Sequence, residues 1–167
     1  VGPLFAARFA PDVSAAAASG TSTAVLLVDV SLSSNPDQFN VWLKLLRTML
    51  DSNREQIGRF AVLFFNVEGF WFKEQFVDNT PKNVAALMAF AESLALEGAT
   101  DLGAALHQAS NPDWLSQGTD PSKWDLFLLS DGAITWGEGD LYALTSGLAG
   151  SHAQSVFAYR SGIQGTD

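Results

Sequence analysis

The chain has 167 residues, of which 47% are hydrophobic and 16% charged, so it can bury a single core and is not a disordered acidic tail. Its formal net charge of −9 argues against binding to nucleic acid, because that binding depends on Lys and Arg and the chain has only nine of them. The absence of cysteine excludes disulfides, thiolate metal sites and cysteine nucleophiles. No stretch approaches the roughly 20 apolar residues that a membrane-spanning helix needs.

The chain is predicted to consist of an N-terminal segment, residues 1–22, and one domain, residues 23–167. In the first segment, residues 4–10 alternate as an edge strand does, and the residues after them are small and polar, as in a linker. Because the chain begins with Val1 rather than Met, we expect it to be a piece of a longer, multidomain protein.

The first strand of the domain determines where a site would lie. Residues 24–28 are continuously apolar, which is typical of a strand buried on both faces of a parallel sheet. Asp29, Ser31 and Ser33 follow directly and place a carboxylate and two hydroxyls at the carboxyl end of this strand. In open α/β sheets, ligands bind at that end.

Helical and strand-like patterns alternate along the rest of the chain. In chain order we expect a helix over 35–50, a strand over 60–65, a hairpin into an edge strand over 70–76, a helix over 79–96, a short helix over 102–109, a strand over 124–129, a helix over 138–148 and a strand over 155–159. This order predicts a doubly wound, Rossmann-like α/β fold, with helices on both faces of a mostly parallel sheet that has one antiparallel edge strand. Asp29 and Asp131, which follow parallel strands, should therefore lie at the same edge.

Five side chains at this edge are candidate metal ligands, and all of them bind through oxygen: Asp29, Ser31, Ser33, Thr100 and Asp131. A site without histidine or cysteine suits a hard cation, so the expected ion is Mg²⁺, with Mn²⁺ or Ca²⁺ as substitutes. Each hydroxyl taken alone has another explanation, because Ser and Thr often satisfy backbone amides in turns and helix caps. The joint pattern favours the metal site.

Three motifs give the sequence a family resemblance: Asp29-x-Ser31-x-Ser33 after the first strand, Gly98-Ala99-Thr100-Asp101-Leu102-Gly103 before a helix, and Leu128-Leu129-Ser130-Asp131-Gly132 after a later strand. In order and spacing they resemble the loops of a von Willebrand factor A domain with its metal-ion-dependent adhesion site. The resemblance covers roughly residues 23–159. The N-terminal strand and the second motif further resemble bacterial relatives of the inter-alpha-trypsin inhibitor heavy chains.

The resemblance implies binding rather than catalysis. It implies that Ser31, Ser33 and Thr100 coordinate the ion directly, while Asp29 and Asp131 act mostly through water or as a switchable ligand. Uncharged direct ligands leave a cation under-neutralised, so a partner protein's Asp or Glu would complete the coordination. The family also implies an extracellular, cell-surface or periplasmic location. It normally has a further strand and helix after the position of Tyr159, and we expect these to be missing here.

Other residues near the predicted edge carry weaker signals. Trp136 is a candidate anchor for a partner, or it packs against the neighbouring helix. Trp71 is expected to pack on the sheet. His107 is not expected to bind the metal, since the other donors are all oxygen, and His152 carries no functional signal.

Two alternative functions remain open. In a phosphoryl-transfer hydrolase, Asp29 would be the nucleophile and Asp131 a metal ligand. Enzymes of the haloacid-dehalogenase type place a second acidic residue where Ser31 stands, and the chain has no Gly-rich phosphate loop, so the sequence disfavours this reading. The second alternative is a structural domain that has lost its metal, which the complete ligand set disfavours.

Overall fold

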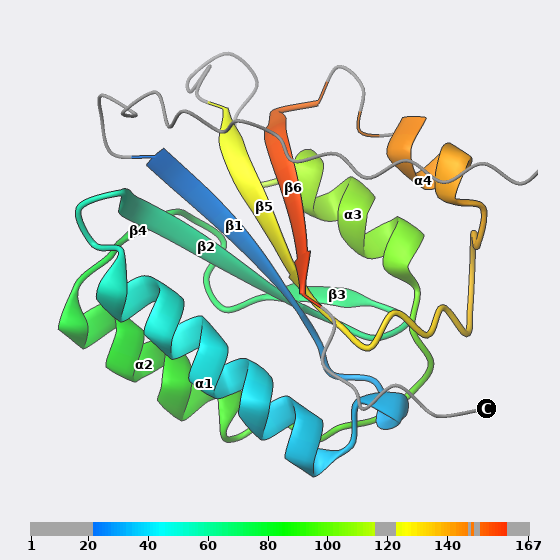
Figure 1. The fold of residues 1–167 in the computed structure, drawn as a ribbon, viewed down its shortest axis with the longest axis horizontal. Coiled ribbons are helices and arrows are strands. Elements are labelled where there is room, and N and C mark those ends of the chain that lie inside the picture. Colours follow the sequence, from blue (N-terminus) through cyan, green and yellow to red (C-terminus); the bar gives the residue numbers. More distant parts are fainter. Residues whose placement is uncertain (1–21, 116–122, 147, 149–150, 160–167) are drawn as a thin grey trace, which may run out of the picture.

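The structure is a computed structural model that describes residues 22–115, 123–146, 148 and 151–159. In these residues one sheet has the strand order β3-β2-β1-β5-β6, and β4 also pairs with β2 (Figure 1). The strands are β1 Ser22–Asp29, β2 Ile57–Phe65, β3 Gly69–Trp71, β4 Val77–Asp78, β5 Trp124–Leu129 and β6 Ala153–Tyr159.

Strand β1 lies at the centre of the parallel part of the sheet, between β2 and β5, and β5 is in turn parallel to β6. Strands β3 and β4 run antiparallel to β2. Asp29 is level with Phe65, and Val28 is level with Leu129, so β1, β2 and β5 end at one edge. The predicted mostly parallel sheet with an antiparallel edge is confirmed.

The helices cover both faces of the sheet, as predicted (Figure 1). They are α1 Pro36–Ser52, α2 Pro81–Ala91, α3 Leu102–Ser110 and α4 Leu141–Ser146, and a short 3₁₀ helix, η1, spans Leu32–Ser34. The core has two layers because side chains of β1 alternate between the faces. Leu26 and Val28 join the layer with residues of α1 and α2, whereas Val25 and Leu27 join the layer with residues of α3.

Polar side chains begin the first three α-helices. The Asn35 carboxamide accepts hydrogen bonds from the amides of residues 37 and 38, and the Thr80 hydroxyl accepts one from the amide of Asn83. A proline follows each of these two caps, at a position where no amide hydrogen is needed. At α3 the capping group is the carboxylate of Asp101, which accepts from the amide of Ala104 at 2.9 Å. The preceding Thr100 hydroxyl is therefore not used as a cap.

The second helix ends earlier than the apolar pattern predicts. The prediction extended it to residue 96, but α2 ends at Ala91, and the Ser93 hydroxyl donates to the carbonyl of Phe90 at 2.7 Å. Leu94 and Leu96 continue the apolar pattern because they pack against the core from a non-helical connection. The last helix, α4, begins at Leu141 rather than at residue 138. In place of the expected edge strand over 70–76, β3 ends at Trp71 and β4 begins only at Val77.

The expected N-terminal strand, residues 4–10, lies outside the described residues. The division of the chain at residues 22 and 23 therefore stays a prediction, although β1 begins at Ser22. None of the helices in the described ranges is long and apolar enough to cross a membrane.

Candidate metal centre

Asp29 ends β1 as a fully buried carboxylate. Its Oδ1 atom accepts a hydrogen bond from the amide of Ser31 at 2.9 Å, and its Oδ2 atom accepts one from the hydroxyl of Ser130 at 2.8 Å. The first bond shapes the loop that follows β1, and the second ties β1 to the end of β5. Because both oxygens are held, the carboxylate has a fixed orientation.

The loop after Asp29 gathers three hydroxyl groups. The Oγ atoms of Ser31 and Ser33 lie 3.0 Å apart, and the Oγ atom of Ser34 lies 3.4 Å from that of Ser31. Ser31 and Ser34 are buried, whereas Ser33 is exposed. Two hydroxyl oxygens at hydrogen-bond distance are near enough to bind one cation together, and the exposed member lies on the side open to solvent.

Thr100 contributes a further buried hydroxyl. The residue is 1% exposed, and its Oγ1 atom has no hydrogen-bond partner among the described residues. Its backbone is well held, because its amide donates to the Thr135 hydroxyl at 2.9 Å and its carbonyl accepts from the amides of Thr135 and Trp136. Buried hydroxyl groups normally have a hydrogen-bond partner, so the unpaired Oγ1 atom is available to a bound water or ion.

Backbone hydrogen bonds join the threonine loop to the serine loop. The amide of Leu32 donates to the carbonyl of Gly98 at 3.1 Å, and the amide of Glu97 donates to the carbonyl of Val30 at 3.0 Å. Residues far apart in the chain are thus fixed side by side at the carboxyl edge of the sheet.

Asp131, the last of the five predicted ligands, lies just after the end of β5. Its Oδ1 atom accepts from the amide of Ala133 at 2.8 Å, and the residue is partly exposed. The neighbouring Ser130 hydroxyl accepts from the amide of Gly132 at 3.0 Å while it donates to Asp29. Gly132 has a φ of 77°, which L side chains rarely adopt, so glycine suits this turn.

The structure therefore places the residues predicted for the site on loops of one edge, and their donor chemistry fits a hard cation. No three His, Cys, Asp or Glu side chains gather as a metal site anywhere in the described ranges, and this candidate site has only two carboxylates, the others being hydroxyls. The assignment of individual ligands stays a prediction.

Sequence reasoning missed three supporting residues. Ser130 stands within the third motif, and its place directly before Asp131 at a strand end was an available signal. Ser34 follows the two predicted serine ligands, and the spacing of the first motif does not include it. For Thr135 the sequence holds no signal, because its contact with Thr100 joins loops 35 residues apart.

Two aromatic residues near the edge differ in exposure. Trp136 is 64% exposed, which disfavours its alternative role of packing against a helix. Its backbone amide donates to Thr100, so the exposed ring belongs to the loop that borders the candidate site. Trp71 is partly buried and makes an edge contact with Trp114, at 5.2 Å between ring centroids, in agreement with its predicted packing role.

The two histidines lie elsewhere. His107 is an exposed residue of α3, nearly two turns beyond the cap. The ring of His152 stacks on Trp124 with 4.9 Å between centroids, a structural contact that the sequence did not reveal.

A mostly parallel sheet with ligand-type oxygens at its carboxyl edge defines an open α/β domain, a class of domain in which ligands bind at that edge. No family model and no curated protein matches the chain, but solved structures do. Over 83% of its length the chain is similar to a von Willebrand factor type A protein from Catenulispora acidiphila, with 18% identity and a TM-score of 0.65. The chain thus has the von Willebrand factor A fold, as the motifs predicted.

Two other solved structures share the fold. One is proximal thread matrix protein 1 from the mussel byssus, described with a zinc-occupied metal-ion-dependent adhesion site, at 17% identity, 83% coverage of this chain and 37% of that chain, and a TM-score of 0.59. The other is the pilus adhesin SpaC from Lactobacillus rhamnosus GG, at 19% identity and a TM-score of 0.53. This match covers 70% of the present chain and 15% of SpaC. The chain spans 32% of the length of the Catenulispora protein.

Proposed function

We propose that this domain is a metal-dependent protein-interaction module that binds Mg²⁺ through Ser31, Ser33 and Thr100 and then binds a carboxylate of a partner protein. The observation that carries this proposal is the buried Thr100 hydroxyl, which has no hydrogen-bond partner in the described part of the chain and stands on a loop bonded to the serine loop. A cation at this position would satisfy that hydroxyl together with the paired serine hydroxyls.

The chemistry of the donor set explains why the partner's group is acidic. The three direct ligands are neutral, and Asp29 has both oxygens engaged in hydrogen bonds with Ser31 and Ser130. A bound divalent ion supplies a positive charge that such ligands neutralise only in part. Ser33 is exposed, so a carboxylate can approach from solvent on its side. An acidic protein can thereby bind an acidic side chain.

The structural neighbours support the same type of function. The mussel protein holds zinc at its adhesion site, and SpaC is a pilus adhesin. For this chain we propose Mg²⁺ as the ion, with Mn²⁺ or Ca²⁺ as substitutes, because oxygen donors alone favour hard cations. We also propose that the chain is part of a larger multidomain protein and acts outside the cell or on its surface.

The hydrolase alternative fits the geometry less well. A nucleophilic Asp29 needs an oxygen open to the phosphate, but this residue is fully buried and both its oxygens accept hydrogen bonds. A screen with a generic aryl phosphate tests the point. We expect no metal-dependent turnover, and turnover that Asp29→Asn abolishes would establish the enzyme instead.

Titration calorimetry with Mg²⁺ tests the proposed ligands. The wild-type chain should bind the ion, Thr100→Ser should retain binding because it keeps the hydroxyl, and Thr100→Ala should weaken it. Changes in residues around metal sites already cost about tenfold to a hundredfold in affinity, so loss of a direct ligand should cost at least as much.

Thr48→Ala is the matched control, because it removes an exposed threonine hydroxyl from α1. It should bind Mg²⁺ as the wild type does. A folded wild-type sample that shows no heat with Mg²⁺, Mn²⁺ or Ca²⁺ would identify a metal-free scaffold and contradict the proposal.

A further inference from the structure

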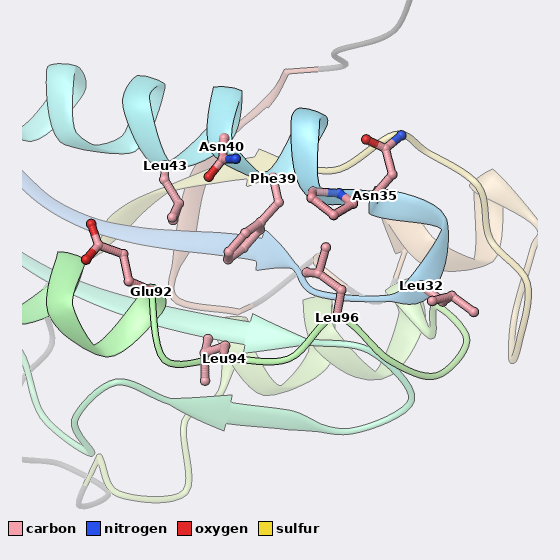
Figure 2. A pocket seen from close by; sticks show the side chains of 9 residues that line it. Leu32, Asn35, Phe39, Asn40, Leu43, Glu92, Leu94 and Leu96 are labelled. Carbon is pink, nitrogen blue, oxygen red and sulfur yellow. The ribbon is translucent and has the colours of Figure 1, made fainter.

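An apolar groove of about 640 Å³ lies between the start of α1 and the connection that follows α2. Phe39 and Leu43 face it from α1, and Leu94 and Leu96 face it from the connection (Figure 2). Its size is within the usual range of ligand-binding clefts, roughly 300–1,000 Å³. The groove depends on the early end of α2, which the apolar pattern of the sequence does not predict.

The walls of the groove are fixed by the fold. Phe39 and Leu43 are buried residues of the core, and Leu94 and Leu96 are partly buried and pack against that core. The connection cannot drift away from α1 easily, because the amide of Glu97 donates to the carbonyl of Val30 at the end of β1. The groove is thus a preformed apolar surface.

The groove reaches the candidate metal centre at Leu32. This residue lies between the proposed ligands Ser31 and Ser33, it lines the groove, and its side chain is 70% exposed. Figure 2 shows Leu32 at one end of the groove and Glu92 at the other, with the apolar side chains between them. One ligand can therefore contact both the groove and the loop that carries the proposed ligands Ser31 and Ser33.

The charges along this path favour a particular order of groups in the ligand. An ion bound at the serine loop would attract a carboxylate, whereas the apolar side chains in the middle of the groove disfavour a charged group. At the far end, Glu92 is exposed and forms no ion pair with any described residue. In a chain with a net charge of −9, such a carboxylate favours a basic group on the partner.

Building on the proposed function, we propose that the partner binds through an extended peptide segment with an acidic residue at the metal and a large apolar side chain in this groove. A basic residue beyond the apolar one lies near Glu92. The apolar side chain supplies the binding energy that a lone carboxylate lacks, and it makes the site selective among acidic proteins.

Panning a phage library of random linear peptides against the wild-type chain in Mg²⁺ tests the proposal. The enriched peptides should combine Asp or Glu with a large aliphatic or aromatic residue at a constant spacing. In the best peptide, labelled with fluorescein, replacement of the apolar residue by alanine should weaken binding by about tenfold or more, as measured by anisotropy. Enriched peptides without a recurrent apolar residue would overturn the proposal.

Two protein variants examine the groove itself. Asn40 lines the groove from an exposed position on α1. Asn40→Trp should therefore obstruct the groove and lower the affinity for the selected peptide by about tenfold. Val41→Trp is the matched control, because Val41 is exposed on the same helix but does not line the groove. Both variants are first checked for a wild-type thermal midpoint. Leu32→Ala, at an exposed position, should also weaken binding and should leave the core unchanged.

The outcomes separate this proposal from the function on which it rests. Peptide binding that needs Mg²⁺ but is unchanged in Asn40→Trp and Leu32→Ala would overturn the groove and leave the metal-dependent function intact. Binding that depends on the apolar residue but persists in excess chelator would overturn the carboxylate contact and the proposed function together. Loss of binding both in chelator and in the groove variants, with Val41→Trp unchanged, supports the whole proposal.

Discussion

Ser130 joins the two aspartates of the candidate metal centre. Its hydroxyl donates to the buried Asp29 at 2.8 Å and accepts from the amide of Gly132 in the turn after Asp131. A buried carboxylate oxygen that loses such a donor has fewer hydrogen bonds. Removal of this hydroxyl should therefore cost more stability than removal of an average surface hydroxyl.

Ser130→Ala should lower the free energy of unfolding by about 1–3 kcal/mol, because it removes a hydrogen bond to a buried carboxylate. It should also weaken Mg²⁺ binding by about tenfold, since Asp29 is no longer held. Urea unfolding and calorimetry measure the two effects. Ser93→Ala, which removes an exposed hydroxyl, is the control and should stay within about 0.5 kcal/mol of the wild type. Equal stability of the two variants would contradict this role.

At the scale of elements, the sequence predicts best where a pattern has one physical cause. The apolar runs at residues 24–28 and 124–129 are strands because both faces of a parallel sheet are buried. Asn35 and the proline after it begin α1 for local reasons of capping. These elements needed no knowledge of distant contacts, and the predicted position of the site at the carboxyl edge followed from them.

The sequence predicts less well where tertiary contacts decide. Leu94 keeps the helical spacing of α2 but packs on the core from outside the helix, so periodicity alone extends the helix too far. Thr100 and Asp101 are both good caps, and only the structure shows that Asp101 caps α3. The role of Ser130 depends on the register between β1 and β5, which no local pattern contains.

Asn79 connects several elements at the opposite end of the sheet. Its buried carboxamide donates to the carbonyl of Leu50 in α1 at 2.8 Å and to that of Ile57 in β2 at 3.0 Å. It thereby satisfies a carbonyl in the last turn of α1, where helical carbonyls lack partners.

Asn79→Ala should therefore lower the free energy of unfolding by about 2 kcal/mol, since it removes two buried hydrogen bonds to backbone carbonyls. Because the residue is remote from the candidate metal centre, Mg²⁺ affinity should be unchanged. Asn83→Ala, which removes an exposed carboxamide bonded to Asp78, is the control with a smaller effect. If calorimetry showed a loss of Mg²⁺ affinity in Asn79→Ala, the contacts of Asn79 and the candidate metal centre would not be independent, contrary to this prediction.

For the whole molecule, metal binding at the proposed site should stabilise the fold. It lies where the loops after β1 and β5 meet the loop before α3, so an ion bound there would bridge segments from both halves of the chain. Any ligand that binds only the folded state stabilises it, by an amount that grows with the logarithm of the ligand concentration once that concentration exceeds the dissociation constant.

Mg²⁺ at about a hundred times its dissociation constant should stabilise the wild-type chain by about 2.7 kcal/mol. For a domain of this size, that corresponds to a rise in thermal midpoint of roughly 5–10 °C. Differential scanning calorimetry measures the shift, which chelator should reverse and which Thr100→Ala should largely lose. A shift of equal size in Thr100→Ala would place the stabilising ion elsewhere.

The most direct test of the central claim is a crystal structure of the chain grown with Mn²⁺, in which anomalous scattering locates the ion. The account predicts one strong peak at the carboxyl edge of the sheet, about 2.1–2.2 Å from the hydroxyl oxygens of Ser31, Ser33 and Thr100. A peak bound away from these hydroxyls, or a well-ordered edge with none, would contradict it.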